Sequence, residues 1–328
     1  MKILFIHQKM LSFVKKDLEI LQSAHDVREL HFKGIKDIYS LFISTIWADL
    51  TFSWFGKLHA FFAVLFSKIL GKRTVVVAGG DDVVYEPETK YGMFSHWWKK
   101  WCPLFVFKNA DLILSVSKYN TLEAIKNAKA NQNKMRMIYH GFDHKRFCRH
   151  KDVKNENIIL TVGNINKETL IRKGIELFVR SAEYLPEIKF YLIGSYSEST
   201  INFLNSFAKT NVVILGRVSN QVLINYMSRA KVYVQTSVHE AFGCSIAQAM
   251  LCECIPVVSD VAAIPEVVGD CGFYVERLSP ENVAEMIKEA LSTSEDLGKK
   301  ARKRIKTVFP LEKRKRELLE AVGLLNYK

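Results

Sequence analysis

The chain has 328 residues, of which 48% are hydrophobic and 25% charged, and it carries a formal net charge of +13. This length allows one large core or two cores of about 150 residues each, and we expect two domains. The six cysteines lack the dense spacing of a disulfide scaffold and form no CxxC pair, so we expect reduced thiols and no structural zinc site.

The N-terminal half alternates short strand-like runs with segments of helical pattern, which favours a parallel sheet. Its predicted strands are Lys2–His7, Asp26–Phe32, Ala48–Ser53, Arg73–Ala78, Asp111–Val116 and Met135–Tyr139. The first of them lacks the apolar core and cleavage site of an export signal, so we expect a cytoplasmic protein. The longest apolar stretch, Leu58–Leu70, is shorter than the roughly 20 residues that span a bilayer, so we expect no transmembrane helix there.

The same pattern begins again after a charged, loop-like stretch, Arg146–Asn157. The predicted strands of this half are Ile158–Gly163, Ile188–Ile193, Val212–Leu215, Val232–Val234 and Ile255–Val258. We therefore place a domain boundary near residue 152. The fold class is α/β, with two Rossmann-like doubly wound domains on either side of a cleft, and ligands beyond the carboxyl ends of the strands. Lys299–Lys306 and Leu311–Leu325 are predicted amphipathic helices with their charges outside.

Positive charge is concentrated in the N-terminal half. Residues 1–150 contain 23 Lys and Arg against 13 Asp and Glu, whereas residues 151–328 contain 24 against 21. Such a charge can attract nucleic acid, but the sequence contains no nucleic-acid-binding motif, so we expect no nucleic acid partner. A phosphate-bearing substrate or an anionic membrane surface explains the charge equally well.

The most informative segment, HEAFGCSIAQAM, follows the strand that ends at Gln235. Its turn contains Ala241, Phe242, Gly243 and Cys244 and leads into a helix that begins near Gly243. Free backbone N–H groups and the positive helix end make this turn a cradle for an anion or a hydroxyl. Glu240 precedes the helix and Gln248 lies about two turns along it, so they can reach different parts of one long ligand. Taken alone, the two residues are equally consistent with an N-cap carboxylate and a surface amide.

This segment resembles glycosyltransferase family 4, whose members are retaining enzymes of the GT-B fold with two glutamates separated by seven residues. In that family the first glutamate and the adjacent backbone amides hold the donor sugar, and the second glutamate holds the ribose. Glu240 matches the first position, and Gln248 stands at the second. An amide still accepts a hydrogen bond from a ribose hydroxyl, but without the strength of a charged acceptor.

A second part of the resemblance begins at Gly163 and Asn164 and continues at Arg172 and Lys173, where the family grips the donor's phosphates. Lys173 matches the family's lysine, whereas Asn164 replaces an arginine, for which Arg172 or Lys167 is a candidate substitute. Fixed cations and a helix N-terminus can stabilise a leaving diphosphate without a metal. Alternatively, Arg172 and Lys173 are exposed residues at a helix start, where cations oppose the macrodipole.

The resemblance implies a role for each part of the chain. Residues 1–151 would form the acceptor-side domain and residues 152–308 the nucleotide-sugar-binding domain. Residues 309–328 would form a helix that packs toward the first domain. Lys173 and Glu240 would be catalytic, with a UDP- or GDP-linked sugar as the donor substrate and with neither a cofactor nor a metal.

The N-terminal half contains further candidates for contact with a substrate. Gly80, Asp81 and Asp82 follow a buried strand, and the two carboxylates could hold sugar hydroxyls, cap their own loop or, less favourably, bind a divalent cation. Ser117 resembles a residue that caps a helix below the donor, and a simple N-cap is the favoured interpretation. His140 lies in a segment that resembles the family's linker and is interpretable as a ligand or as a structural histidine.

Aromatic and basic residues alternate from Tyr91 to Trp101, as they do in segments at membrane interfaces. The residues concerned are Tyr91, Phe94, Trp97, Trp98, Lys99, Lys100 and Trp101. Docking on an anionic bilayer, peripherally at its inner face, would bring the protein to a lipid-linked acceptor. A helix whose aromatic side faces the core is the alternative.

We therefore predict a glycosyltransferase that moves a sugar from a nucleotide-sugar donor to a sugar or lipid-linked acceptor with retention. Two alternatives remain open. One is a GT-B epimerase or phosphorylase. The other is a catalytically weakened binding or partner subunit, which is suggested by Asn164 and Gln248 at positions where the family has charged residues.

Overall fold

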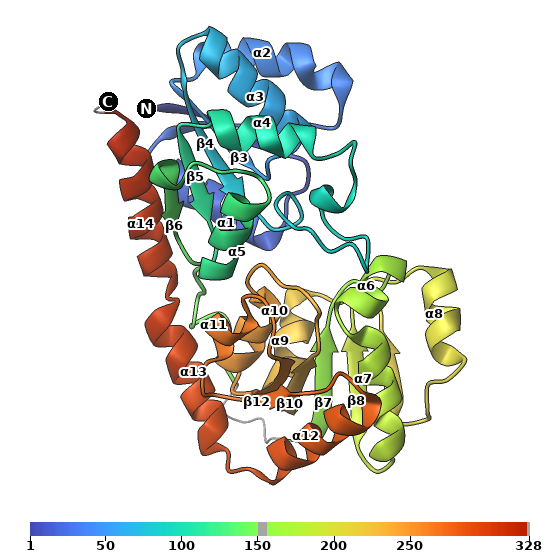
Figure 1. Cartoon of the computed structure of the whole chain (residues 1–328). Helices are drawn as coiled ribbons and strands as arrows, with labels where there is room; N and C mark the ends of the chain where they lie inside the picture. Colours follow the sequence, from blue (N-terminus) through green and yellow to red (C-terminus); the bar gives the residue numbers. More distant parts are fainter. Residues whose placement is uncertain (150–155, 327–328) are drawn as a thin grey trace. The chain divides into compact units, whose positions relative to one another are not determined.

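The computed structural model of the chain describes residues 1–149 and 156–326. It divides into two compact units, one formed by Met1–Gly141 with the segment from Leu311 onward, the other by Phe142–Pro310. Each unit contains one six-stranded sheet with helices on both faces (Figure 1). The predicted boundary near residue 152 lies outside the described residues.

All strands of the N-terminal sheet are parallel, in the order β2-β1-β3-β4-β5-β6. They are β1 (Lys2–His7), β2 (Asp26–His31), β3 (Leu50–Trp54), β4 (Arg73–Ala78), β5 (Leu112–Ser115) and β6 (Met135–Met137). The central strands β1, β3 and β4 are almost wholly buried, as expected of apolar runs covered on both faces. The edge strand β2 is mostly exposed and correspondingly polar.

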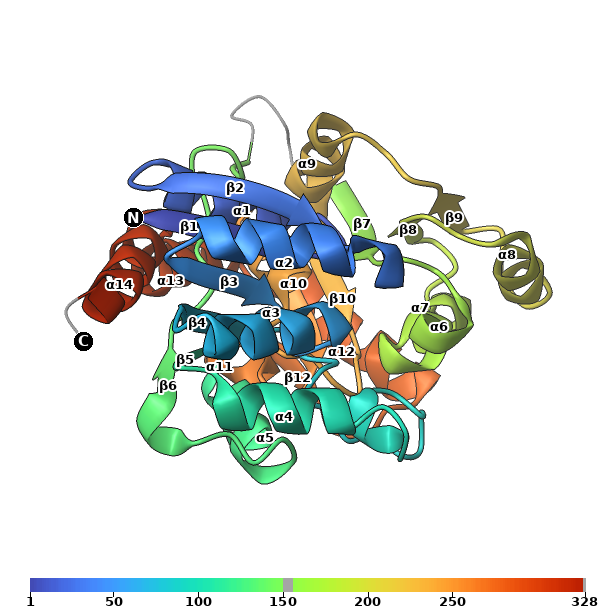
Figure 2. The same ribbon diagram turned by 90° about the horizontal axis from the view of Figure 1, so that it is seen from above.

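Helices cover both faces of this sheet. They are α1 (Ser12–Gln22), α2 (Ile38–Trp47), α3 (Leu58–Ile69), α4 (Trp101–Asn109), α5 (Lys118–Lys126) and α14 (Leu311–Gly323), with short 3₁₀ turns η1 (Ile35–Asp37), η2 (Met93–Ser95) and η3 (Gln132–Lys134). Figure 2 shows α2, α3 and α4 side by side along one face. Helix α14 packs against α1.

A buried ion pair fixes α14 within this unit. The Arg314 guanidinium donates to both carboxylate oxygens of Asp17, at 2.7 and 2.6 Å, and to the carbonyl oxygens of Ile138 and Tyr139. Both charged side chains are almost inaccessible to solvent, so each depends on the other for its partner.

The sheet of the second unit is also parallel, in the order β12-β11-β10-β7-β8-β9. Its strands are β7 (Glu156–Val162), β8 (Lys189–Ile193), β9 (Val212–Leu215), β10 (Ala230–Gln235), β11 (Ile255–Ser259) and β12 (Phe273–Val275). The helices are α6 (Lys167–Arg172), α7 (Ile175–Ser181), α8 (Glu198–Asn205), α9 (Asn220–Arg229), α10 (Cys244–Leu251), α11 (Ile264–Val268), α12 (Pro280–Ser292) and α13 (Asp296–Val308). The predicted α/β class with two Rossmann-like units is confirmed.

Candidate active site

The loop that carries Arg172 and Lys173 differs from its prediction. The two residues do not begin a helix: Arg172 is the last residue of α6 and Lys173 is its C-cap, where cations complement the macrodipole. Nor are they exposed, because their side chains retain only 12% and 19% of their accessible surface. A capping box between Asn166 and Thr169 fixes the start of α6, and this short helix then ends at Arg172.

Gly174 ends α6 and turns the chain directly into α7. Its φ of +65° lies in the left-handed region that glycine adopts readily. A Cβ atom at this position would lie 2.4 Å from the carbonyl oxygen of Thr236, so only glycine fits against the end of β10. The Lys173 side chain passes Gly163 so closely that a Cβ there would lie 3.1 Å from Lys173 Cδ. The two glycines thus set the path of the lysine.

Glu240 lies directly in front of this lysine. Its Oε1 atom accepts hydrogen bonds from Lys173 Nζ at 3.2 Å, Gln235 Nε2 at 2.8 Å and Ser237 Oγ at 3.1 Å. The Glu240 side chain keeps 13% exposure. One carboxylate oxygen is therefore fixed by the protein, while the side chain as a whole is still partly accessible.

The charge of Glu240 is stabilised locally. Burial opposes its ionisation, but the nearby charges of Lys173 and Arg172 outweigh this effect and hold the pKa of Glu240 below its ordinary value. Arg172 also forms an ion pair with Glu168 at 3.4 Å, and its carbonyl oxygen accepts from the backbone of Val238. The two cations and the carboxylate form one coupled group at the carboxyl edge of the sheet.

Two residues that belong to this group, Gln235 and Ser237, were not predicted from the sequence. Gln235 and Ser237 flank the end of β10 and hold Glu240, while the buried Tyr233 hydroxyl donates to Gln235 Oε1 at 2.8 Å. Their position at a strand end, five and three residues before Glu240, was an available signal.

The turn between β10 and α10 has the predicted start of its helix. Gly243 is the N-cap of α10 and has a φ of +100°. The Phe242 ring is buried against Phe142 and Phe309, with ring centroids 5.8 and 5.3 Å away, so only its backbone can contact a ligand. Ala241 and Cys244, before and after Phe242 in the chain, are half-buried, and so is Gln248 on α10.

Asn164 does not join this group. It is exposed, and its Oδ1 accepts a hydrogen bond from Ser195 Oγ at 2.8 Å. The side chain is therefore held toward the loop that follows β8.

The N-terminal candidates have mainly structural contacts. The buried Asp82 carboxylate accepts hydrogen bonds from the backbone N–H groups of Gly56, Gly79 and Gly80 at 2.7 to 3.0 Å, which folds the loop after β4. Burial and the neighbouring Asp81 raise the pKa of Asp82 to about 7. Asp81 accepts from Lys57 Nζ at 2.5 Å and is more exposed.

Ser117 and His140 are both buried. Ser117 is the N-cap of α5 and accepts from the backbone of Asn120 at 2.9 Å. His140 stacks on Trp54 with 6.0 Å between ring centroids and also contacts Phe13. Burial, with the charge of Arg314, keeps the pKa of His140 well below its ordinary value, so the ring is neutral near pH 7.

Neither a cluster of metal ligands nor a membrane-spanning helix occurs in the part of the chain that the structure describes. Over residues 1–149 and 156–326, no three His, Cys, Asp or Glu side chains are grouped so that they could hold a metal ion. In the same ranges, every helix is too short or too polar to cross a bilayer.

Two Rossmann-like units with parallel sheets define the GT-B class of fold, and comparisons with known proteins agree. Among solved structures, HepE of Anabaena in complex with UDP and glucose has a TM-score of 0.81 at 16% identity, over 99% of this chain and 100% of HepE. Sucrose-phosphate synthase of Thermosynechococcus elongatus has a TM-score of 0.80 at 17% identity, over 99% of each chain.

The sequence comparisons identify the family. Residues 144–307, half of the chain, match the model of the glycosyl transferases group 1. The chain is also 25% identical over 254 residues to an uncharacterized 41.2 kDa protein in the cps region of Klebsiella pneumoniae, a match that covers 73% of this chain and 69% of that protein. The chain belongs to the glycosyl transferases group 1 family and is a glycosyltransferase.

Proposed function

We propose that this enzyme transfers a sugar from a UDP- or GDP-linked donor to an acceptor with retention at the anomeric carbon and without a bound metal. The observation that carries the proposal is the contact between Lys173 and Glu240, 3.2 Å apart at the carboxyl edge of the second sheet. It places a cation suited to a diphosphate beside a carboxylate suited to sugar hydroxyls.

In this proposal the cations stabilise the leaving group. Departure of a nucleoside diphosphate builds negative charge on its β-phosphate, and preorganised cations stabilise such charge in a site from which water is excluded. Lys173 is held by Gly163 and Gly174, and Arg172 adds a second charge. The first turn of α10 supplies backbone N–H groups near Glu240.

Glu240 orients the sugar in the same proposal. Its Oε1 atom is held by Gln235 and Ser237, and the partly exposed carboxylate would accept from a donor-sugar hydroxyl. Gln248 would accept from the ribose. The presence of UDP and glucose in HepE, which shares the fold, supports a nucleotide sugar as the donor.

We further propose that the acceptor is a sugar or a lipid-linked glycan that binds to the N-terminal unit, with the protein peripheral at a membrane. Phe94 packs against the core of this unit, whereas Trp97 and Trp98 are 78% and 53% exposed. This exposure favours the interfacial interpretation of the aromatic and basic segment.

A second candidate is a binding subunit with weakened catalysis. The observation that favours it is the bond between Asn164 and Ser195, which leaves phosphate binding to Lys173 and Arg172. Turnover with an acceptor separates the two candidates.

The test is incubation with a panel of UDP- and GDP-sugars and candidate acceptors, with and without EDTA. The proposal predicts acceptor-dependent release of nucleoside diphosphate that EDTA does not affect. It also predicts a product whose anomeric configuration, determined by NMR, equals that of the donor. An inverted product, loss of turnover with EDTA, or donor binding without any turnover would each contradict it.

A further inference from the structure

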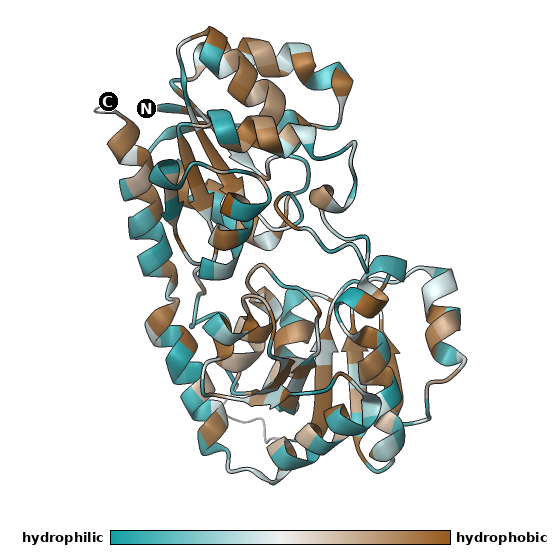
Figure 3. Cartoon of the chain, viewed as in Figure 1, coloured by the Kyte–Doolittle hydropathy of each residue, from teal (hydrophilic) through white to brown (hydrophobic). Residues whose placement is uncertain are grey.

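The outer side of α2, α3 and α4 exposes an unusual amount of apolar surface. Eight large apolar side chains on these helices and the segments leading into them are about half exposed or more. They are Ile35, Tyr39, Ile43, Ile46, Ile69, Trp97, Trp98 and Trp101, which together we call the three-helix face. Figure 3 shows hydrophobic residues along much of these helices. Extended apolar patches on a protein surface mark interaction sites.

The helices that carry the three-helix face form one packed layer. Ring contacts run from α2 to α4 beneath it: Phe42 on α2 contacts Phe66 on α3, with centroids 5.1 Å apart. Phe66 contacts Phe62, which contacts Phe61, and Phe61 contacts Trp101 on α4 at 5.0 Å. The exposed side chains therefore stand on one packed layer.

The charged residues of the segments that form this face are nearly all basic. Residues 35–47, 57–72 and 93–109 contain seven lysines and one acidic residue, Asp37. The Asp37 carboxylate accepts from the backbone N–H groups of Lys33 and Gly34, so it is engaged locally. Isoleucine and tryptophan together with several lysines and a single acidic residue is a composition typical of surfaces that lie in the interface of an anionic bilayer.

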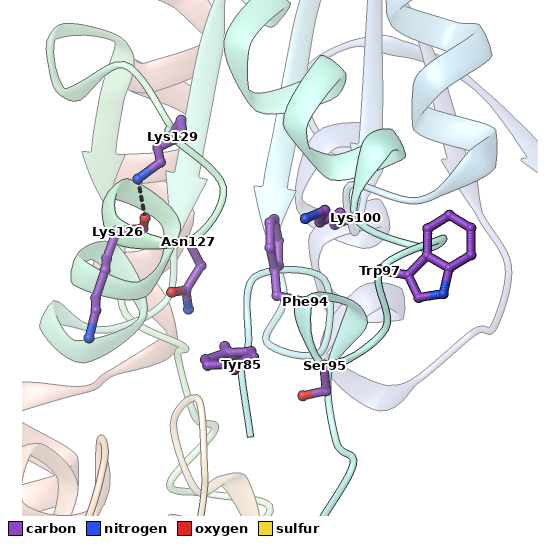
Figure 4. Close-up of a pocket in the computed structure, with 8 residues that line it drawn as sticks. All are labelled: Tyr85, Phe94, Ser95, Trp97, Lys100, Lys126, Asn127 and Lys129. Atoms are coloured by element: carbon purple, nitrogen blue, oxygen red, sulfur yellow. Dashed lines mark hydrogen bonds between the residues drawn. The ribbon is translucent and has the colours of Figure 1, made fainter. Parts of the chain in front are cut away.

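A hollow with three lysines adjoins one end of the face. It has a volume of about 560 Å³ and lies between Tyr85, Phe94 and Trp97 on one side and Lys126 and Lys129 on the other, with Lys100 above Phe94 (Figure 4). Trp97 belongs to both the face and the hollow. Ammonium groups next to aromatic rings suit a phosphate headgroup.

We propose that the three-helix face is a membrane-docking surface: its isoleucines and tryptophans enter the interface of an anionic bilayer, and the hollow takes a lipid phosphate. A second copy of the chain fits less well, because two faces that each carry this excess of lysine repel one another. The inference deepens the membrane part of the proposed function, but it does not depend on sugar transfer.

The experiment is co-sedimentation of the full chain with vesicles of phosphatidylcholine alone or with added phosphatidylglycerol. We expect binding that needs the anionic lipid and weakens with salt. All five tryptophans lie in the N-terminal unit, and brominated acyl chains should quench the emission of the exposed ones. Trp97→Phe combined with Trp98→Phe should remove most of this quenching.

Two pairs of variants test the face itself. Ile43→Ser with Ile46→Ser should weaken vesicle binding about tenfold or more, whereas Val222→Ser with Leu278→Ser, at similarly exposed positions of the second unit, should not. Lys99→Gln with Lys100→Gln should weaken it about tenfold or more, whereas Lys303→Gln with Lys306→Gln on α13 should not.

Three outcomes would overturn the proposal: no binding to anionic vesicles, equal weakening by the control pairs, or self-association that the isoleucine pair abolishes while vesicle binding persists. Titration of the same variants with a nucleotide sugar distinguishes failure of the docking surface from failure of the proposed sugar transfer. The three-helix face is remote in sequence from Lys173 and Glu240, so its variants should leave donor binding unchanged. Donor binding that persists when vesicle binding is absent overturns only the docking surface.

Discussion

Lys173 and Glu240 lie 67 residues apart in the sequence and share one hydrogen bond. In the absence of a ligand each neutralises the other, so neither is a buried unpaired charge. A donor would place its phosphate on the cation and its sugar on the carboxylate. The two side chains therefore make separable contributions to affinity.

Replacing Glu240 with glutamine tests this separation. The amide cannot offer a charged acceptor to a sugar hydroxyl, so we expect the nucleotide sugar to bind about ten- to hundredfold more weakly, which corresponds to about 1.5–3 kcal/mol. The free nucleoside diphosphate should bind as well as before or better, because a negative charge beside its site is removed. Calorimetric titration with both ligands measures the difference. Equal weakening of both would show that Glu240 does not contact the sugar.

His59 gives a prediction for pH. It is fully buried on α3, donates from Nε2 to the carbonyl oxygen of Trp54, and burial lowers its pKa to about 4. Between pH 4 and the unfolded value near 6.5, the unfolded chain binds more protons than the folded one. Stability from this residue is therefore complete above about pH 6.5 and is lost as the pH falls, by up to about 3 kcal/mol.

A His59→Gln variant isolates this effect. Asp82, with its raised pKa, acts in the opposite direction over a similar range, but it is present in both chains and cancels from their difference. Denaturation followed by tryptophan emission reports on the N-terminal unit alone, because that unit contains every tryptophan. The wild-type advantage over the variant should shrink from pH 7 to pH 4. A difference that does not change with pH would contradict the assignment.

Among the elements, the turn from α6 to α7 depends most on a single residue. Gly174 and Gly71 both have a φ of +65°, but only Gly174 lacks room for a Cβ, since nothing lies within 4 Å of one at Gly71. Gly71→Ala should therefore cost only the backbone strain, about 1–2 kcal/mol. Gly174→Ala should cost more, because the backbone of Thr236 must also move.

Two measurements check this pair. Circular dichroism should show the larger loss of stability for Gly174→Ala, and donor titration should show weaker binding for that variant alone, because Lys173 shifts. Retained donor affinity in Gly174→Ala would mean that the turn does not position the lysine.

How far the elements could be predicted follows from their burial. The central strands appear as apolar runs because both of their faces are covered, and β1 and β4 have their predicted bounds, as does the edge strand β9. The edge strand β12 was missed, whereas β6, which has the same length and also lies at a sheet edge, was predicted. The alternative that placed Arg172 and Lys173 at a helix start is wrong, because α6 ends at these residues and Gly174 separates it from α7.

The site could be predicted in part from the positions of its residues after strands. Glu240 and Lys173 follow strands of a parallel sheet, and the carboxyl ends of these strands meet at one edge. Their proximity could therefore be predicted from the sequence. Gln235 and Ser237 also lie at a strand end, but the contacts of their side chains with Glu240 are visible only in the folded chain. The sequence also could not show that Arg314 pairs with Asp17, which lies 297 residues away.

At the scale of the whole molecule, the chain passes between its two units twice, after Gly141 and after Pro310. The two passages lie next to each other, because the backbone N–H of Phe142 donates to the carbonyl oxygen of Phe309 at 3.0 Å. The proposed glycosyl transfer requires that the second unit first binds the nucleotide-sugar donor. The proposed activity therefore depends first on donor binding by that unit.

Calorimetric titration of a nucleotide sugar into the wild type, Lys173→Ala and Lys209→Ala tests it most directly. Lys209 is an exposed lysine of the same unit that pairs with Glu183, and so it controls for the loss of one positive charge. We predict that Lys173→Ala weakens binding about tenfold or more while Lys209→Ala leaves it unchanged. Failure of every UDP- and GDP-sugar to bind the wild type, or equal affinities for the two variants, would contradict the account.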